Sequence, residues 1–302
     1  MIRILASDGL DVSAAGVLQN KGFEVVQKFF EQGELIKQVR EFDVLIVRSA
    51  TKIREPVINA ALETGRLKMI VRGGVGVDNI DVGYALDRGI KVFNTPNASS
   101  VSVAELTIAH MLSLSRYIYM SNITMRKGKW EKKKYTGVEI NGKTLGLIGF
   151  GRVAVETAKR AKALGMDVVY TKKSGPAEGY DEYRYMPLDR LLTCADYISL
   201  HVSSSNEKKP VIGREEIAAM KEGVFIINTS RGDALCEDSL LDALDSGKVA
   251  AAAIDVFTEE PVKNERLITH PKISMTPHIG ASTAEAQKRI GSEVVDIILN
   301  NI

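Results

Sequence analysis

Short apolar runs alternate with longer segments of helical spacing along the chain, and the first four runs lie before residue 72. Each run has the length and the β-branched content of a strand in a parallel sheet. Their alternation with helix-length segments predicts βαβ units, and therefore a first, smaller α/β domain. The expected strands are Ile2–Ala6, Phe23–Val26, Val44–Val47 and Lys68–Val71.

A second series of apolar runs follows residue 143, and a glycine motif comes directly after its first strand. Gly149-x-Gly151-x-x-Ala154 links that strand to a helix expected over Arg152–Leu164. Gly149 permits a tight turn and Gly151 lets the backbone approach a pyrophosphate, so this order predicts a dinucleotide-binding fingerprint. The expected strands are Thr144–Ile148, Asp167–Thr171, Tyr197–Leu200, Val224–Asn228, Ala251–Asp255 and Ile273–Met275.

Two capping boxes mark long helices outside these strands. Ser102-x-x-Glu105 predicts a helix over 102–126, and Ser282-x-x-Glu285 predicts a C-terminal helix that ends near Leu299. Apolar residues cover nearly every face of the 102–126 helix, which predicts burial all round. Because one modest domain offers little room for such a helix, we interpret it as a dimerisation helix.

The predicted fold is α/β, with two doubly wound parallel-sheet domains. A Rossmann dinucleotide-binding domain, residues 98–279, is inserted in a smaller flavodoxin-like substrate-binding domain, residues 1–97 plus 280–302.

Composition and charge narrow the function classes. Apolar residues form 45% and charged residues 26% of the 302 positions, as in soluble globular proteins. A formal net charge of +2 gives no reason to expect nucleic acid or an anionic membrane as partner. Cys194 and Cys236 fit a reducing cytosol, and the chain starts with a strand rather than a signal peptide. We therefore expect a cytoplasmic protein, and we predict no metal site.

A series of motifs, in order from about residue 44 to the end, resembles the D-2-hydroxyacid dehydrogenases. Within that family the chain is most similar to the branch that oxidises 3-phospho-D-glycerate, in a short form without a C-terminal regulatory domain. The motifs are Val47-Arg-Ser-Ala-Thr-Lys52, Gly76-Val-Asp-Asn-Ile80, Asn94-Thr-Pro-Asn97, Gly128-Lys-Trp-Glu131, Leu145-Gly-Leu-Ile-Gly-Phe-Gly-Arg152, Asn228-Thr-Ser-Arg-Gly232, Asp255-Val-Phe-Thr-Glu-Glu-Pro261 and Pro277-His-Ile-Gly-Ala-Ser-Thr283.

The resemblance implies three catalytic residues, Arg231, Glu260 and His278. Arg231 offers a planar fork of donors for a substrate carboxylate. His278 would take the hydroxyl proton, while Glu260 would orient the imidazole and stabilise its cation. Of the other histidines, His110 is expected to be structural and His270 to lie on the surface.

The resemblance also implies NAD as the cofactor, but one expected residue is missing. An acid normally follows the second fingerprint strand and binds the ribose hydroxyls, whereas this chain has Lys172 there. A lysine would attract a 2′-phosphate, so NADP is possible as well. The predicted cofactor contacts are Gly149, Gly151, Arg152, Val153, Lys172, His201, Val202, Thr229, Asp255, His278 and Gly280.

For the substrate, the resemblance implies contacts from the first domain and from a basic run. The residues are Arg48, Ser49, Arg72, Gly74 and Lys132. A second arginine suits a second anionic group such as a phosphate. The basic run around Lys132 resembles a segment that in this family reaches the substrate site of the neighbouring subunit.

The implied function is NAD-dependent oxidation of 3-phospho-D-glycerate to 3-phosphohydroxypyruvate, a step of serine biosynthesis. A glyoxylate, hydroxypyruvate or D-lactate reductase is the alternative with the same chemistry. A dinucleotide-sensing, corepressor-like binding protein is the alternative of another class, although the joint presence of the three catalytic residues favours an enzyme. The expected partners are a small phosphorylated hydroxy acid and a second copy of the chain, without nucleic acid or membrane.

Overall fold

The computed structural model describes residues 1–203 and 209–302, and the chain divides into two compact units. The first unit comprises Met1–Ser99 and Ala281–Ile302, and the second comprises Ser100–Gly280. The crossings therefore lie one or two residues beyond the expected boundaries, and Gly280 lies in the second unit rather than the first.

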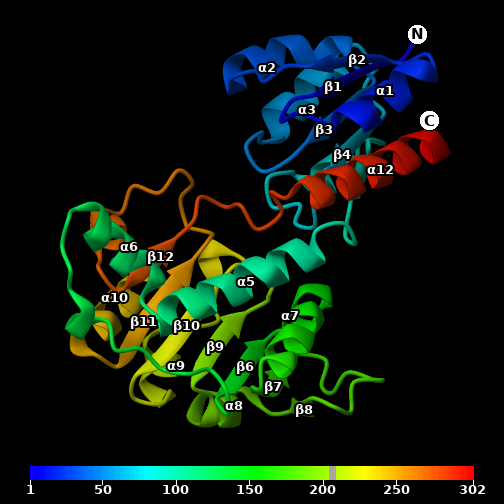
Figure 1. Ribbon diagram of the computed structural model, residues 1–302. Coiled ribbons are helices and arrows are strands. Elements are labelled where there is room, and N and C mark those ends of the chain that lie inside the picture. The colour runs from blue at the N-terminus through cyan, green and yellow to red at the C-terminus, as the bar shows by residue number, and fades with distance from the viewer. Residues whose placement is uncertain (204–208) are drawn as a thin grey trace. The chain divides into compact units, whose positions relative to one another are not determined.

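The first unit is built on a five-stranded parallel sheet in the order β2-β1-β3-β4-β5, the order of flavodoxin-like folds. Helices α1 and α12 cover one face of this sheet, and α2, α3 and α4 cover the other (Figure 1). The strands are β1 Arg3–Ala6, β2 Glu24–Gln27, β3 Val44–Val47, β4 Met69–Arg72 and β5 Lys91–Asn94. The helices are α1 Val12–Asn20, α2 Gln32–Gln38, α3 Glu55–Leu62, α4 Val82–Leu86 and α12 Ala284–Asn301, with a 3-10 helix over Val39–Glu41.

The second unit is built on a seven-stranded parallel sheet in the order β12-β11-β10-β9-β6-β7-β8. This is the dinucleotide-binding order with one further strand, and the direction of winding reverses between β6 and β9. The strands are β6 Thr144–Ile148, β7 Asp167–Thr171, β8 Arg184–Tyr185, β9 Tyr197–Leu200, β10 Val224–Asn228, β11 Val249–Ile254 and β12 Ile273–Met275. The predicted fold class is confirmed.

Helices cover both faces of the seven-stranded sheet (Figure 1). Apolar residues of α5 and α7 pack on one face, and those of α8 to α11 pack on the other. The helices are α5 Ser100–Ser115, α6 Ile118–Arg126, α7 Arg152–Ala163, α8 Leu188–Cys194, α9 Arg214–Ala219, α10 Glu237–Ser246 and α11 Glu265–Thr269, with 3-10 helices over Lys132–Lys134 and Gly232–Ala234.

The prediction of one helix over 102–126 is wrong, because the segment forms two helices, α5 and α6. Tyr117 has a left-handed backbone with φ 54°, which no α-helix can continue through. The carbonyl of Ser115 accepts from the N–H of Val138 at 2.9 Å. Helix α5 packs against the sheet and α7 of its own unit, which bury Ile108, Met111 and Leu114. Helix α6, by contrast, has no buried residue.

Both predicted capping boxes are displaced. Helix α5 begins at Ser100, two residues before the expected Ser102 cap. Helix α12 is capped by Thr283, whose Oγ1 accepts from the N–H of Ala286 at 3.1 Å, and not by Ser282. Within residues 1–203 and 209–302, no helix has the length and apolar character needed to cross a membrane.

Candidate active site

The glycine turn of the second unit connects β6 to α7 and adopts the conformation that a phosphate cradle requires. Gly149 has φ +92°, and a Cβ at this position would lie 2.2 Å from the carbonyl oxygen of His201. Gly151 is the N-cap of α7 and has no side chain to cap the helix, and apart from its chain neighbours no atom of the described residues lies within 4 Å of where its Cβ would be. Arg152 and Val153 therefore begin the helix with N–H groups that can bind an anion.

His201 follows β9, the strand beside β6, at the point where the winding reverses. Its Nε2 lies 2.9 Å from Oγ of Ser199, whereas its buried Nδ1 has no hydrogen-bond partner among residues 1–203 and 209–302. Burial lowers the pKa of His201 to about 3, so the ring is neutral at pH 7. An orphaned polar atom and an open glycine turn at adjacent strand ends fit a bound dinucleotide.

The end of β7 holds Lys172 next to this turn. The N–H of Gly149 donates to the carbonyl of Thr171 at 3.0 Å, and the carbonyl of Lys172 accepts from Gly175 at 3.0 Å. The loop beyond is fixed by the hydroxyl of Tyr170, which accepts from the N–H of Ala177 at 2.8 Å. Lys172 itself is exposed, and the strand carries no acid at its carboxyl end.

His278 and Glu260 are in direct contact. Nδ1 of His278 lies 2.8 Å from Oε2 of Glu260, and Oε1 of Glu260 accepts from the N–H of Phe257 at 3.1 Å. Because a carboxylate only accepts, Nδ1 carries a proton, and in the neutral ring Nε2 then has the lone pair. His278 has φ 52°, an unusual backbone for a residue other than glycine.

The charge of Arg231 acts on this pair. Burial raises the pKa of the Glu260 carboxyl, but the hydrogen bond from His278 and the positive charge of that ring when it is protonated oppose burial. The N–H of Phe257 and the positive charge of Arg231 lower it further, so the pKa lies below its ordinary value. Glu260 is therefore ionised at neutral pH, as the orienting partner of an imidazole must be.

Asn228, at the end of β10, shapes the loop that carries Arg231, and sequence reasoning did not single it out. Its Nδ2 donates to the carbonyl of Arg231 at 2.8 Å, and its Oδ1 accepts from the N–H of Ser230 at 3.1 Å. The loop also runs close to the backbone after β11, since a Cβ on Gly232 would lie 2.0 Å from the carbonyl carbon of Phe257. Asn228 and Gly232 thus fix the backbone at Arg231.

Two further predicted cofactor contacts, Asp255 and Thr229, are buried and form hydrogen bonds within the second unit. Asp255, 1% exposed, accepts from the hydroxyl of Thr276 at 2.6 Å and from the N–H groups of Ile279 and Gly280 at 2.8 and 2.9 Å. Its carboxylate therefore holds the turn that carries His278. Thr229 is also buried, and its hydroxyl lies 2.9 Å from that of Thr107.

In the first unit, the loop after β3 that carries Arg48 and Ser49 is held by two residues absent from the predicted site. Oδ2 of Asp8 accepts from the N–H groups of Arg48 and Thr51 at 2.6 and 3.1 Å. Nδ2 of Asn79 donates to the carbonyls of the same two residues at 2.7 and 2.6 Å. Burial lowers the pKa of the Arg48 guanidinium against the charge of Asp8, so this cation is poorly solvated.

The guanidinium of Arg72 lies against Gly74. Arg72 ends β4, where it pairs in register with Val47 of β3, and its guanidinium folds back over Gly74. A Cβ on Gly74 would lie 1.3 Å from Nη1 of Arg72, so a larger residue here would displace this guanidinium. Lys132, the remaining predicted contact, is exposed in the 3-10 helix Lys132–Lys134 of the second unit.

Residues 108–280 match the NAD-binding domain of the D-isomer specific 2-hydroxyacid dehydrogenases. The chain is 46% identical to a hydroxypyruvate reductase of Thermotoga maritima, over 99% of this chain and 98% of that protein. It is 43% identical to a D-3-phosphoglycerate dehydrogenase of Methanocaldococcus jannaschii, over 99% of this chain but only 57% of that protein. The solved structure of TT0316 from Thermus thermophilus matches with a TM-score of 0.90 at 33% identity, over 99% of this chain and 96% of that one.

The chain belongs to the D-isomer specific 2-hydroxyacid dehydrogenase family. The resemblance inferred from the motifs is confirmed, and so is the expectation of a nicotinamide cofactor, since the matched domain of this dehydrogenase family binds NAD. The Thermotoga and Methanocaldococcus relatives are named as a reductase and a dehydrogenase, which favours an enzyme over the corepressor-like alternative.

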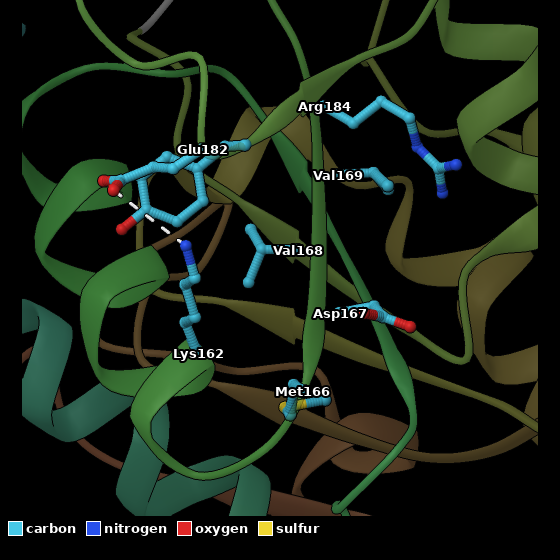
Figure 2. A pocket seen from close by; sticks show the side chains of 8 residues that line it. Lys162, Met166, Asp167, Val168, Val169, Glu182 and Arg184 are labelled. Atoms are coloured by element: carbon cyan, nitrogen blue, oxygen red, sulfur yellow. Dashed lines mark ion pairs between the residues drawn. The ribbon is translucent and has the colours of Figure 1, made fainter.

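A cavity of about 340 Å³ lies at the other end of the dehydrogenase's seven-stranded sheet (Figure 2). It is found at the amino ends of β7 and β8, where Lys162 points toward the carboxylate of Glu182 at 3.9 Å. Asp167 and Arg184 contribute one further charge of each sign. Because the glycine turn lies at the carboxyl ends of the strands, this cavity is not part of the candidate active site.

The two glycines of the turn can be separated experimentally. We expect Gly149→Ala to destabilise the ligand-free protein by roughly 2 kcal/mol or more, because of its positive φ and the His201 carbonyl. We expect Gly151→Ala to leave the unfolding temperature unchanged but to weaken NAD binding about tenfold, because its methyl group would occupy the space that a phosphate enters. Thermal unfolding and calorimetric titration with NAD would measure both. Unchanged NAD affinity in Gly151→Ala would contradict the proposed cradle.

Proposed function

We propose that this dehydrogenase oxidises 3-phospho-D-glycerate to 3-phosphohydroxypyruvate with NAD. The observation that carries the proposal is a pair of arginines, Arg48 and Arg72, at the carboxyl ends of the adjacent strands β3 and β4. Arg231 can bind the carboxylate common to all 2-hydroxy acids, so these two cations suit a second anion. Phosphoglycerate has such an anion in its phosphate, whereas the corresponding ends of lactate, glycolate and glycerate are neutral and offer these two cations no anionic group.

In the proposed mechanism, Nε2 of His278 accepts the proton of the substrate C2 hydroxyl. Its lone pair is available because Nδ1 donates to Glu260 at 2.8 Å. The ionised Glu260 stabilises the imidazolium that results, and Arg231 holds the substrate carboxylate and the developing carbonyl oxygen. In the reverse direction His278 returns the proton to that oxygen.

NAD, when bound, supplies the acceptor for the hydride that leaves C2. The residues that would hold it are the glycine turn with Arg152 and Val153, together with His201, Val202, Thr229, Asp255 and Gly280. All of them follow the carboxyl ends of strands in one parallel sheet.

Hydroxypyruvate reduction is the second candidate, and the comparison with the Thermotoga protein favours it. That relative is named a hydroxypyruvate reductase and is covered over 98% of its length, whereas the chain spans 57% of the phosphoglycerate dehydrogenase. The two 2-oxo acids, 3-phosphohydroxypyruvate and hydroxypyruvate, differ only by the phosphate group. The residues that meet this phosphate therefore decide between the two functions.

We expect Arg48→Ala to lower kcat/KM for 3-phosphohydroxypyruvate by about 10- to 100-fold, the worth of a charge-assisted hydrogen bond. Activity on hydroxypyruvate and glyoxylate should change less than threefold on the same scale. Arg88→Ala, which alters an exposed arginine of the same unit, serves as the control. Parallel steady-state assays would decide the substrate. Equal losses on all substrates would contradict the phosphate role and favour hydroxypyruvate.

Lys172 leads us to propose that the enzyme accepts NADP as well as NAD, with NAD preferred. We expect Lys172→Asp to lower kcat/KM for NADP at least tenfold, because a carboxylate repels the 2′-phosphate, and to preserve or improve activity with NAD. Lys162→Asp, at the opposite end of the sheet, should change neither. A parent enzyme that rejects NADP a thousandfold, together with a mutant no better with NAD, would show that Lys172 does not meet the ribose.

We also propose a homodimer formed through α6 and the segment after it. Ile118, Met125 and Trp130 are 54%, 53% and 79% exposed on the single chain, an unusual density of exposed large apolar residues. Lys132 lies in the same segment, so the partner subunit would receive it near its substrate. Ile118→Asp with Met125→Asp should give a monomer by light scattering, whereas Val12→Asp, at an 82% exposed site, should not. An intact dimer in the double variant would refute this interface.

A further inference from the structure

Four side chains of the second unit form a line of hydrogen bonds that ends at the turn carrying His278. Oγ of Ser274 lies 3.4 Å from Nδ1 of His110, and Nε2 of His110 lies 3.0 Å from Oγ1 of Thr276. The hydroxyl of Thr276 in turn lies 2.6 Å from Oδ1 of Asp255. Three of the four are less than 10% exposed, so water cannot readily replace these bonds.

The direction of every bond in this line follows from the chemistry of its last member. The carboxylate of Asp255 only accepts, so the single hydroxyl proton of Thr276 points toward it. Thr276 must then accept from His110, which places the proton of His110 on Nε2. Nδ1 of His110 is left to accept from Ser274. Burial lowers the pKa of His110, so the ring is neutral and can fill both roles.

The turn at the end of the line has a conformation that needs external support. His278 is one of two non-glycine residues with positive φ among those that the structure describes. Such a backbone costs on the order of 1–3 kcal/mol, and it persists only where the surroundings hold it. The N–H groups of Ile279 and Gly280 donate to the two oxygens of Asp255, and the N–H of His278 donates to the carbonyl of Thr276 at 3.0 Å.

We propose that His110 and Thr276 are positioning residues for catalysis, which fix the carboxylate of Asp255 and thereby hold His278 in its left-handed conformation against Glu260. Thr276 contributes twice, since its hydroxyl anchors Asp255 and its carbonyl anchors the backbone of His278. His110 lies on α5, so the catalytic turn is tied to a helix packed across the sheet. The sequence suggested only a structural role for His110, and this proposal adds a positioning role. The inference rests on the proposed role of His278.

The first test needs neither substrate nor cofactor. The chain has only four histidines, so ¹⁵N-histidine NMR of the ligand-free protein can be assigned by single substitutions. We expect His110 as the neutral Nε2–H tautomer and His278 with its proton on Nδ1. In Thr276→Val and His110→Leu, the His278 signal should lose this single-tautomer signature, because the ring no longer stays against Glu260. Thr276→Ser retains the hydroxyl and should restore it.

The second test is kinetic and uses whichever of 3-phosphohydroxypyruvate and hydroxypyruvate the parent reduces. We expect Thr276→Val and His110→Leu to lower kcat about tenfold through misplacement of His278, with a smaller change in substrate KM. Ser115→Ala, which removes a buried hydroxyl from the same helix α5, should cost stability but leave kcat unchanged. Thr276→Ser should keep most of the parent kcat.

His278→Asn tests the proposed catalytic role of His278 separately from the positioning role of His110 and Thr276. We expect it to lower kcat by roughly 10²–10⁴-fold. If it retains the parent kcat, the proposed role of His278 is wrong, while the NMR signals still report on the turn. If both Thr276→Val and His110→Leu keep the parent kcat and the parent tautomer of His278, the positioning role is overturned, whatever happens to the unfolding temperature.

Discussion

Parallel pairing of strands is the constraint on which the candidate site depends. In a parallel sheet all carboxyl ends lie at one edge, so residues distant in sequence emerge side by side. The ends of β6, β7, β9, β10, β11 and β12 thus bring together the glycine turn, Lys172, His201, the Arg231 loop, Asp255 and the His278 turn. Helices pack on both faces of this sheet, so the candidate site lies in the loops beyond its carboxyl edge.

A second feature recurs in the two units. In each, an aspartate that follows one strand accepts N–H groups from the loop after the neighbouring strand. Asp8 follows β1 and holds the loop after β3, whereas Asp255 follows β11 and holds the turn after β12. Backbone N–H groups at strand ends have left the sheet ladder, and a carboxylate satisfies two of them at once. The same solution positions Arg48 in one unit and His278 in the other.

The elements that sequence reasoning missed are those with a weak periodic signal. Strand β5 has a polar residue at each end, and β8 has only two residues, so neither forms the apolar run that marks a strand. No proline or glycine near Tyr117 indicates in the sequence that the helix is interrupted there. Asp8, Asn79 and Asn228 act through backbone atoms of distant loops, which a linear motif does not reveal.

By itself, the sequence determined the two α/β units, the glycine turn and the family, because buried strands require apolar runs and a phosphate cradle requires glycine at fixed spacing. Tertiary structure decided how the reactive groups are held. The proton on Nδ1 of His278 follows from Glu260, eighteen residues away in the chain, and the tautomer of His110 follows from Asp255 through Thr276. These choices depend on which atoms meet across the sheet edge, and such contacts have no periodicity in the chain.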